Sequence, residues 1–341
     1  MHERGKNLAI RKSNYESYDY REFWEDNKRI YEDKSERLAL KKLMAGLKID
    51  SRIFLDIGCG YGRLFNEYMN FKNIIMVDYS LKGLKTARDN IRKFLANDKQ
   101  KLSSVYFIAA DATSLPFKSD CIDFLLTVRV IHHLNSPEKY FNEVCRILKN
   151  EGLYFLEFAN KRNLKNILRY FIGKMDTSPF NLIPSQIGET ILNFHPKYIT
   201  SFLHERNFII KRLISVSNFR SELLKKCIST KLLLLFENMY QNFFSSISIG
   251  PSIFLKSVLY KKEAGKNFYK FIGSKINSSD VLSNDNARKS LLKKYLKINI
   301  CDILICPCCK KENLLFEKSK IFCTSCKKIF SIEDGIYNFK K

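Results

Sequence analysis

The stretch Leu55-Asp56-Ile57-Gly58-Cys59-Gly60-Tyr61-Gly62 decides the fold of this 341-residue chain. It continues the apolar run at 53–55, and a second apolar run at 73–78 ends in Asp78. A strand, a glycine turn, a helix and a second strand with a terminal acid are typical of a nucleotide-binding α/β sheet. Glycine suits the turn because the turn requires backbone angles that other residues do not readily adopt. Glycine also lets a ligand approach the main chain closely. A carboxylate at Asp78 is placed to accept hydrogen bonds from both hydroxyls of a ribose.

The spacing of the glycines narrows the ligand class. Gly58, Gly60 and Gly62 form a Gly-x-Gly-x-Gly pattern, whereas dinucleotide binders carry Gly-x-Gly-x-x-Gly and this chain has Arg63 at the last position. The dinucleotide pattern seats a pyrophosphate on a helix N-terminus. A ligand without phosphates, such as S-adenosylmethionine, does not need that arrangement.

At this point the chain resembles the class I S-adenosylmethionine-dependent methyltransferases, in their type-11-like domain. Five motifs in the family's order carry the resemblance, and they are residues 55–62, 77–80, 110–117, 123–134 and 143–152. In the last motif Asn150 and Glu151 stand where the family often has Pro-Gly. The resemblance covers residues 52–160 and implies an S-adenosylmethionine-dependent methyltransferase.

The resemblance also implies a set of cofactor contacts. The implied residues are Asp56, Gly58, Gly60, Gly62, Asp78, Tyr79, Asp111, Ala112 and Thr127. The glycines would let the methionine part lie against backbone, and Asp56 would orient its ammonium group. Asp78 would bind the ribose and Tyr79 would pack on the adenine, whose amino group would donate to Asp111. A turn role for Asp111 is the alternative.

Arg129 and His133 follow the fourth strand, where substrate meets cofactor in the family, and are the candidate catalytic residues. His133 is a candidate general base, with a role in starting a helix as the alternative. Methyl transfer from a sulfonium mainly requires alignment of the nucleophile with the methyl carbon, so few acid–base residues are obligatory. The sequence Asn-Pro-Pro-Tyr does not occur, which disfavours methylation of exocyclic base amines or glutamine amides.

Apolar runs alternate with helical patterns along most of the chain, which predicts an α/β fold. We expect a Rossmann-like, seven-stranded, mostly parallel sheet with helices on both faces and an antiparallel last strand. The predicted strands are 52–57, 73–78, 104–109, 122–128, 152–158, 208–217 and 252–261. The predicted helices are 62–71, 81–96, 136–149, 163–173 and 196–207, with one or two more within 220–247.

The predicted domains are an N-terminal helical lid (1–50), a methyltransferase domain (51–262), a basic linker (263–300) and a zinc-ribbon-like domain (301–341). Within the second, 51–160 forms the cofactor half and 161–262 the substrate side. For 1–50, helices packed on the sheet edge are the alternative to a lid. We expect the apolar run at 232–236 in the core, with a position on a membrane surface as the alternative.

Two cysteine pairs near the C-terminus predict a structural zinc site. Cys306 and Cys309 are separated from Cys323 and Cys326 by 13 residues, and two such pairs on facing turns bring four thiolates to tetrahedral distance. Residues 301–339 resemble a small zinc-ribbon family that includes the activator subunit of tRNA, rRNA and release-factor methyltransferases. A fused copy implies a permanent partner within the chain or a substrate-docking module.

The chain carries a net charge of +24, and residues 161–300 hold 24 basic and 8 acidic side chains. This excess favours a polyanionic partner such as RNA, with a lysine-rich composition as the alternative. No apolar run reaches the roughly 18–20 residues of a membrane span, and we expect a cytoplasmic protein with reduced cysteines. Three hypotheses follow: methylation of RNA or a ribonucleoprotein, methylation of a small or lipid-like acceptor such as a quinone precursor, or a non-catalytic cofactor-binding scaffold.

Overall fold

A computed structural model describes most of the chain. The described residues are 21, 24, 29–48, 52–134, 136–187, 191–245, 247–261 and 297–340. Most of the predicted N-terminal lid and of the predicted linker therefore lies outside the described residues. Among the described residues, no helix is both long enough and apolar enough to cross a bilayer.

The predicted α/β sheet is confirmed. Seven of its strands run in the order β3-β2-β1-β4-β5-β9-β8, with β9 antiparallel to both of its neighbours. These strands are β1 (Ile53–Ile57), β2 (Asn73–Asp78), β3 (Val105–Ala109), β4 (Ile122–Thr127), β5 (Leu148–Ala159), β8 (Phe208–Val216) and β9 (Ser252–Leu259). Every residue of β1 is buried, because the strand lies in the middle of the sheet with both faces covered.

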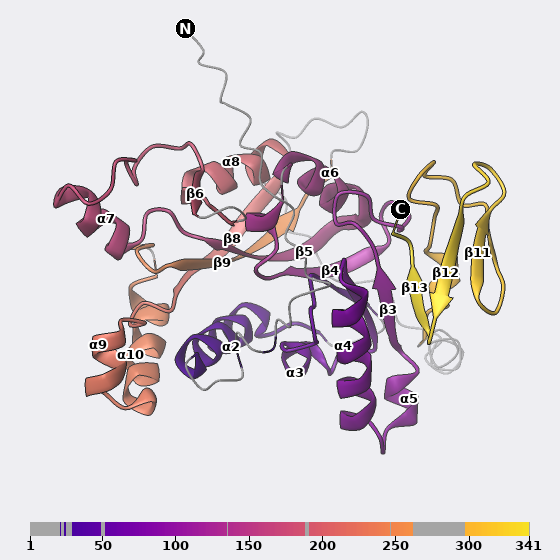
Figure 1. Ribbon diagram of the computed structural model, residues 1–341, viewed down its shortest axis with the longest axis horizontal. Helices are drawn as coiled ribbons and strands as arrows, with labels where there is room; N and C mark the ends of the chain where they lie inside the picture. The colour runs from indigo at the N-terminus through magenta and orange to yellow at the C-terminus, as the bar shows by residue number, and fades with distance from the viewer. Residues whose placement is uncertain are drawn as a thin grey trace, which may run out of the picture.

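Helices cover both faces of this sheet (Figure 1). On one face lie α6 (Pro137–Ile147) and α8 (Pro196–Glu205), whose apolar side chains form one core cluster with the sheet. On the other lie α2 (Ile30–Met44), α3 (Phe65–Tyr68) and α4 (Leu81–Phe94), which form a second cluster. The shorter elements are α5 (Lys99–Leu102), η1 (Ile131–His133), α7 (Leu164–Phe171), β6 (Ser185–Ile187), β7 (Ile191–Asn193) and α9 (Glu222–Cys227).

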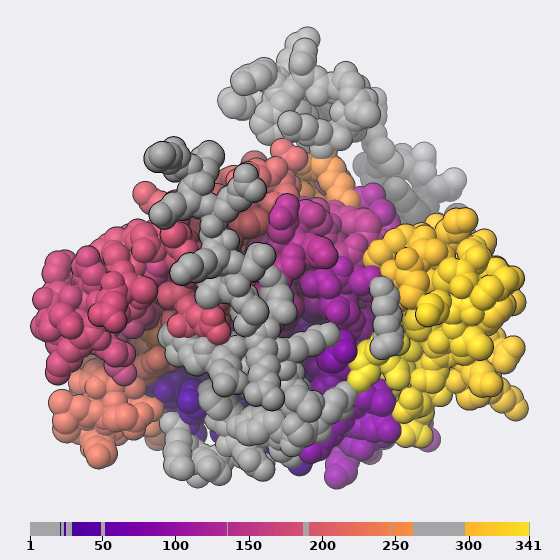
Figure 2. All heavy atoms as spheres, turned by 45° about the horizontal axis from the view of Figure 1, so that its top comes forward, coloured from indigo at the N-terminus to yellow at the C-terminus, as the bar shows by residue number. Residues whose placement is uncertain are grey.

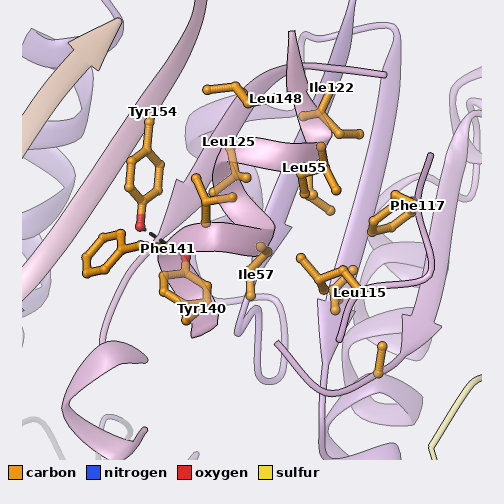
Figure 3. Packing of buried hydrophobic residues seen from close by; sticks show 14 of the residues in the cluster. Leu55, Ile57, Leu115, Phe117, Ile122, Leu125, Tyr140, Phe141, Leu148 and Tyr154 are labelled. Atoms are coloured by element: carbon orange, nitrogen blue, oxygen red, sulfur yellow. Dashed lines mark hydrogen bonds between the residues drawn. The ribbon is translucent and has the colours of Figure 1, made fainter. Parts of the chain in front are cut away.

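Figure 3 shows the core on the α6 face. Leu55 and Leu125 of neighbouring strands belong to this core together with Phe141 of α6, and all three are fully buried. The hydroxyls of Tyr140 and Tyr154 lie 3.0 Å apart within this apolar layer, so each buried hydroxyl has a partner.

The C-terminal strands extend the same sheet. Strands β10 (Leu314–Phe316), β11 (Lys320–Cys323), β12 (Ile329–Glu333) and β13 (Ile336–Asn338) pair in order, after the short η3 (Ile300–Asp302). Strand β13 pairs in parallel with β3, which places Tyr337 opposite Ile108. The result is an 11-stranded sheet, and the ribbon residues Ile321 and Phe330 belong to the core cluster on the α6 face.

The insertion before β9 differs from the sequence expectation. It holds α9 and α10 (Thr230–Phe243), and α10 packs against α2 and β8. The expectation that the apolar run at 232–236 lies in the core is wrong for Leu232, Leu235 and Phe236, which are 39–53% exposed. Leu233 alone in that run is buried, because α10 turns a polar face toward the body of the protein.

Candidate active site and metal centre

A cavity of about 190 Å³ opens at the carboxyl ends of β1, β2, β3 and β4. It lies at the point where the order of the parallel strands reverses, which is where open α/β sheets bind ligands. The structure brings most of the predicted site residues to its wall. These are Gly58, Gly60, Asp78, Tyr79, Asp111, Ala112, Arg129 and His133.

Asp78 ends β2 and fixes the turn that follows β1. Its Oδ2 accepts a hydrogen bond from the backbone N–H of Gly60 at 2.7 Å, and its Oδ1 accepts from the N–H of Ser80 at 2.8 Å. A carboxylate offers about four lone-pair sites, so Asp78 is able to accept several hydrogen bonds at once. Asp78 therefore positions the glycine loop and presents acceptors to the cavity at once.

Asp111 lies two residues beyond the end of β3, at the same edge of the sheet. Its Oδ1 accepts from the backbone N–H of Thr113 at 2.8 Å and from the Thr113 hydroxyl at 2.7 Å, which forms an Asx turn. The hydrogen bonds therefore show the turn role, and Asp111 also lines the cavity, whereas its contact with an adenine amino group stays a prediction. The turn engages Oδ1 and leaves Oδ2 as an acceptor for a ligand amino group.

Gly58 and Gly62 serve the loop in different ways. Both have positive φ angles, +80° and +81°. A Cβ at position 58 would lie 2.0 Å from Cγ2 of Val130, which belongs to the loop after β4. Any side chain at position 58 would therefore collide with that loop. Gly62 does not line the cavity; the space beside its backbone is filled by Ala87 and Ile91 of α4.

Thr127, the last residue of β4, does not line the cavity either. Its side chain is fully buried, and its hydroxyl lies 2.5 Å from that of Tyr140 in α6. The structure therefore places Thr127 in the core beneath the site. We infer a supporting role, since its hydroxyl ties the end of β4 to α6.

Asp56 lines a smaller pocket of about 30 Å³ that shares Gly58, Gly60 and Arg129 with the main cavity. The hydroxyl of Tyr68 donates to Asp56 Oδ2 at 2.5 Å. Burial raises the pKa of Asp56 from 3.8 to about 7, and the nearby carboxylate of Asp78 adds to the increase. A cation bound beside Asp56 would reverse this effect, because it favours the ionised carboxylate.

This pKa predicts a pH-dependent affinity for S-adenosylmethionine. If the ligand ammonium pairs with Asp56, binding requires the ionised carboxylate, so affinity should fall as pH drops below about 7, by up to about tenfold per unit. Asp56→Asn should bind weakly with a flat profile, as measured by calorimetry from pH 5.5 to 8. 5′-Methylthioadenosine, which lacks the ammonium, is the matched control and should show no such slope. A slope retained in Asp56→Asn would contradict the assignment.

The raised pKa also affects folding. Because Asp56 binds its proton more tightly in the folded chain than in the unfolded chain, it contributes stability at low pH. That contribution declines as the pH rises from about 4 and is lost above about 7.

Arg129 connects the cavity to the N-terminal helix. Its φ of +60° is unusual for a side-chain-bearing residue, and its N–H donates to Glu157 Oε2 at 2.8 Å. Its Nε donates to Glu36 Oε1 of α2 at 3.0 Å. Arg63 of the glycine loop binds the other oxygen of Glu36 at 2.6 Å, and the guanidinium groups of Arg63 and Arg129 both lie over the Trp24 ring.

Sequence reasoning missed Glu36 and Arg63 as residues of this region. Glu36 is fully buried, and the two guanidinium groups hold its pKa below the usual value despite its burial. A buried charge without such partners would be strongly destabilising. The only signal in the sequence was an acid in the middle of an amphipathic helix, which ordinarily faces solvent.

The two histidines of η1 differ in environment. His133 lines the cavity, whereas His132 is buried and does not. Burial lowers the pKa of His132 well below its usual range, so it stays neutral. The two rings lie 4.1 Å apart, and His132 packs behind His133. Of the pair, His133 is the one in a position to meet a substrate.

The four predicted zinc ligands form a cluster. The Sγ atoms of Cys306, Cys309, Cys323 and Cys326 all lie within 4.8 Å of one another. Two of the Sγ–Sγ distances are 3.6 Å, close to the edge of about 3.8 Å expected for a tetrahedron with Zn–S bonds of about 2.3 Å. The donor set and its size therefore fit Zn²⁺. Cys308, a fifth cysteine that lies beside Cys309 in the sequence, is outside the cluster.

The two cysteine pairs sit on matching turns. After each pair a lysine adopts a positive φ, +57° at Lys310 and +62° at Lys327. The N–H of Cys306 donates to Lys311 O at 3.0 Å, and the N–H of Cys323 donates in the same way to Lys328 O at 2.9 Å. The repetition of the turn is what brings the two pairs face to face.

One of these turns touches the loop after β3. The Ser114 hydroxyl donates to Pro307 O at 2.9 Å, and Lys310 Nζ lies 2.8 Å from Glu143 Oε2. The same Glu143 oxygen accepts from the N–H of Leu115 at 2.8 Å. The metal centre and the loop that carries Asp111 are therefore joined by direct hydrogen bonds.

Comparison with known proteins identifies the domain. Residues 55–156 match the model of a family described as a methyltransferase domain. The chain therefore contains a methyltransferase domain, as the five motifs predicted. An uncharacterized protein of Methanocaldococcus jannaschii, MJ0638, is 36% identical over 112 residues, which are 33% of this chain and 43% of that protein.

A second relative has a named activity. The ubiquinone/menaquinone biosynthesis C-methyltransferase UbiE of Vibrio parahaemolyticus is 26% identical over 159 residues, 45% of this chain and 57% of that protein. The chain spans about half the length of these relatives.

Solved structures of low sequence identity also align. One chain from the complex between the Haloferax volcanii Trm112 methyltransferase activator and a methyltransferase aligns with a TM-score of 0.47 and 14% identity. The alignment covers 71% of this chain and 96% of the other chain. Magnesium protoporphyrin IX methyltransferase of Synechocystis aligns with a TM-score of 0.46 and 16% identity, over 70% and 87%.

Proposed function

We propose that this protein is an S-adenosylmethionine-dependent methyltransferase. The observation that carries the proposal is the cavity at the strand ends, where Asp78 and Asp111 present acceptors from adjacent strands beside a glycine loop. The lining of the same cavity includes the apolar residues Ile57, Val77 and Ala110, which suits a nucleoside. S-adenosylmethionine supplies a methyl group already activated on a sulfonium.

The residues of the chain then have to bind and align. Asp78 binds the ribose, Asp111 the adenine amino group, and Tyr79 packs on the ring. Asp56 holds the ammonium, while the backbone of Gly58 and Gly60 allows close approach. Fixing the nucleophile in line with the methyl carbon at about 3 Å supplies most of the acceleration.

We infer that His133 is the residue placed to take a proton from the acceptor, because it lines the cavity beyond the strand ends. Arg129 acts differently in this proposal. Its guanidinium is engaged by Glu36 and Trp24, so it ties α2 and Trp24 to the wall of the site. We propose that α2 and Trp24 help to cover the cofactor, as part of a lid would.

We further propose that the cysteine cluster holds one structural Zn²⁺. The ribbon extends the sheet at β3 and shares its core, and its turn contacts the loop of Asp111. A metal there would brace the adenine end of the site from outside. This role requires no contact between the ion and a substrate.

For the acceptor we favour a small or lipid-like molecule. The support is the relative named for quinone biosynthesis, together with the many exposed apolar side chains of α7 and α10 on the substrate side of the chain. RNA is the second candidate, because residues 161–300 carry an excess of 16 basic side chains, 24 against 8 acidic.

The test is methyl transfer from labelled S-adenosylmethionine to an extract separated into lipid, RNA and protein. We expect label in the lipid fraction with the wild type and none with Asp78→Ala. Label in RNA, with salt-sensitive RNA binding, would overturn the lipid-like acceptor. A protein that binds the cofactor but labels no fraction would instead favour the non-catalytic scaffold.

A further inference from the structure

Helix α10 turns its apolar face outward. The exposed apolar stripe consists of Leu232, Leu235, Phe236, Met239 and Phe243, which recur at helical spacing and are 39–74% exposed. The buried side of the helix carries Leu233, Glu237 and Gln241. A surface helix of a water-soluble protein usually shows the reverse arrangement.

Hydrogen bonds fix this orientation. Buried Glu237 accepts from the hydroxyl of Tyr31 at 2.7 Å and from the N–H of Ser217 at 2.8 Å. Gln241 donates to Ser35 O at 3.1 Å. Rotating α10 to bury its apolar stripe would strip these partners from a buried carboxylate, which is costly. The outward stripe is therefore set by the folded chain itself.

Helix α7 adds a second apolar element. None of its residues is buried. Near its end Tyr170, Phe171 and Phe180 form a trio with ring centroids 6.0–6.3 Å apart. Phe171 is 72% exposed and the following Ile172 is 63% exposed. Large apolar side chains gathered in this way mark an interaction surface.

The two helices occupy the same end of the molecule. The N–H of Leu164, the first residue of α7, donates to Ile249 O in the segment that follows α10, at 2.8 Å. Figures 1 and 2 both show α7 and α10 at the end opposite the zinc ribbon. We call these exposed apolar side chains of α7, residues 172–183 and α10 the apolar end.

The same part of the chain carries exposed basic residues, on α7, the segment after it, α9 and α10. They are Lys165, Arg169, Lys174, Lys226 and Lys231. Among the described residues of 162–185 and 220–245, the exposed acids are Asp176 and Glu222, and Glu222 pairs with Lys225 at 2.8 Å. Exposed apolar and aromatic side chains on helices that also carry exposed lysine and arginine suit the headgroup region of an anionic bilayer.

We propose that the apolar end docks on the surface of an anionic lipid bilayer. Insertion of Phe171 and Phe243 would remove apolar area from water, while the exposed cations pair with headgroup phosphates. The docking does not depend on the identity of the acceptor. Docking of this end would give a lipid-like acceptor a route to the site. Helix α7 follows the carboxyl end of β5, and β5 is the neighbour of β4, whose carboxyl end borders the cavity.

The experiment is co-sedimentation of the full-length protein with phosphatidylcholine vesicles, with and without phosphatidylserine. We expect binding to the anionic vesicles and weak binding to the neutral ones. Phe171→Ser with Phe243→Ser should weaken binding by about tenfold or more. Leu315→Ser with Ile329→Ser is the matched control, because these side chains are 56% and 62% exposed on the ribbon and should not matter.

A second variant separates charge from apolar contact. Lys165→Gln, Arg169→Gln and Lys231→Gln together should abolish the preference for phosphatidylserine while leaving cofactor affinity unchanged. Absence of vesicle binding, or equal loss in the ribbon control, would overturn the proposal. The proposal would also be overturned if the protein bound no vesicles but self-associated or bound RNA, and if the Phe171 and Phe243 substitutions removed that interaction.

Discussion

Asp78→Ala is expected to lower the affinity for S-adenosylmethionine and S-adenosylhomocysteine by about tenfold or more. A carboxylate–hydroxyl hydrogen bond contributes roughly 1.5–3 kcal/mol, and about 1.4 kcal/mol is tenfold. The substitution removes the ribose acceptor and also frees the N–H groups of Gly60 and Ser80. Both effects act on the same ligand, so the loss should appear for substrate and product alike by calorimetry.

Asp78→Asn helps to separate the two effects. The amide keeps one acceptor oxygen for the loop and removes the charge, so it should lie between wild type and Asp78→Ala. Lys149→Ala is a control for general destabilisation, because it breaks an ion pair with Asp123 at 2.8 Å and does not line the cavity. Unchanged affinity in Asp78→Ala would remove the basis for the proposed cofactor site.

The sequence predicted the parts of the site that depend on strand order. Asp78 ends β2 and Asp111 lies two residues beyond the end of the adjacent, parallel β3, so their positions follow from the alternation of strands and helices. The side-chain direction of Thr127 does not follow from strand order. It depends on the packing of α6 against β4, where Tyr140 binds the Thr127 hydroxyl.

Contacts distant in sequence were also beyond prediction. Glu36 and Arg129 are 93 residues apart, and no local pattern connects them. The outward face of α10 arises because Glu237 finds buried partners in Tyr31 and Ser217, on other elements. A hydrophobic pattern alone assigns such a stripe to the core, which is why the expectation for 232–236 failed.

The ribbon illustrates the same limit. Its cysteine spacing predicted a four-thiol cluster, because the ligands lie on local turns. Its attachment to the β3 edge could not be predicted, because the pairing of Tyr337 with Ile108 joins segments more than 200 residues apart. Because the ribbon shares the core of the methyltransferase domain, loss of its metal is expected to have the largest effect on the stability of the protein.

Removal of Zn²⁺, by chelation or by Cys306→Ser, is expected to destabilise the whole described fold. Cys306 and Cys323 are fully buried and share a core cluster with Leu115 and Phe117 of the methyltransferase domain. Loss of ribbon order would expose the β3 edge and part of that cluster. A cost of several kcal/mol corresponds to a fall of about 10 °C or more in Tm, measurable by calorimetry with and without chelator.

Cys308→Ser is the matched control, since this thiol is two residues from Cys306 and outside the cluster. It should keep one zinc per chain and the wild-type Tm, whereas Cys306→Ser should lose both. The zinc-free protein should also bind S-adenosylmethionine more weakly, because Ser114 and Glu143 would lose their contacts with Pro307 and Lys310. Absence of zinc after reducing purification, or full occupancy in Cys306→Ser, would show that the four cysteines are not its ligands.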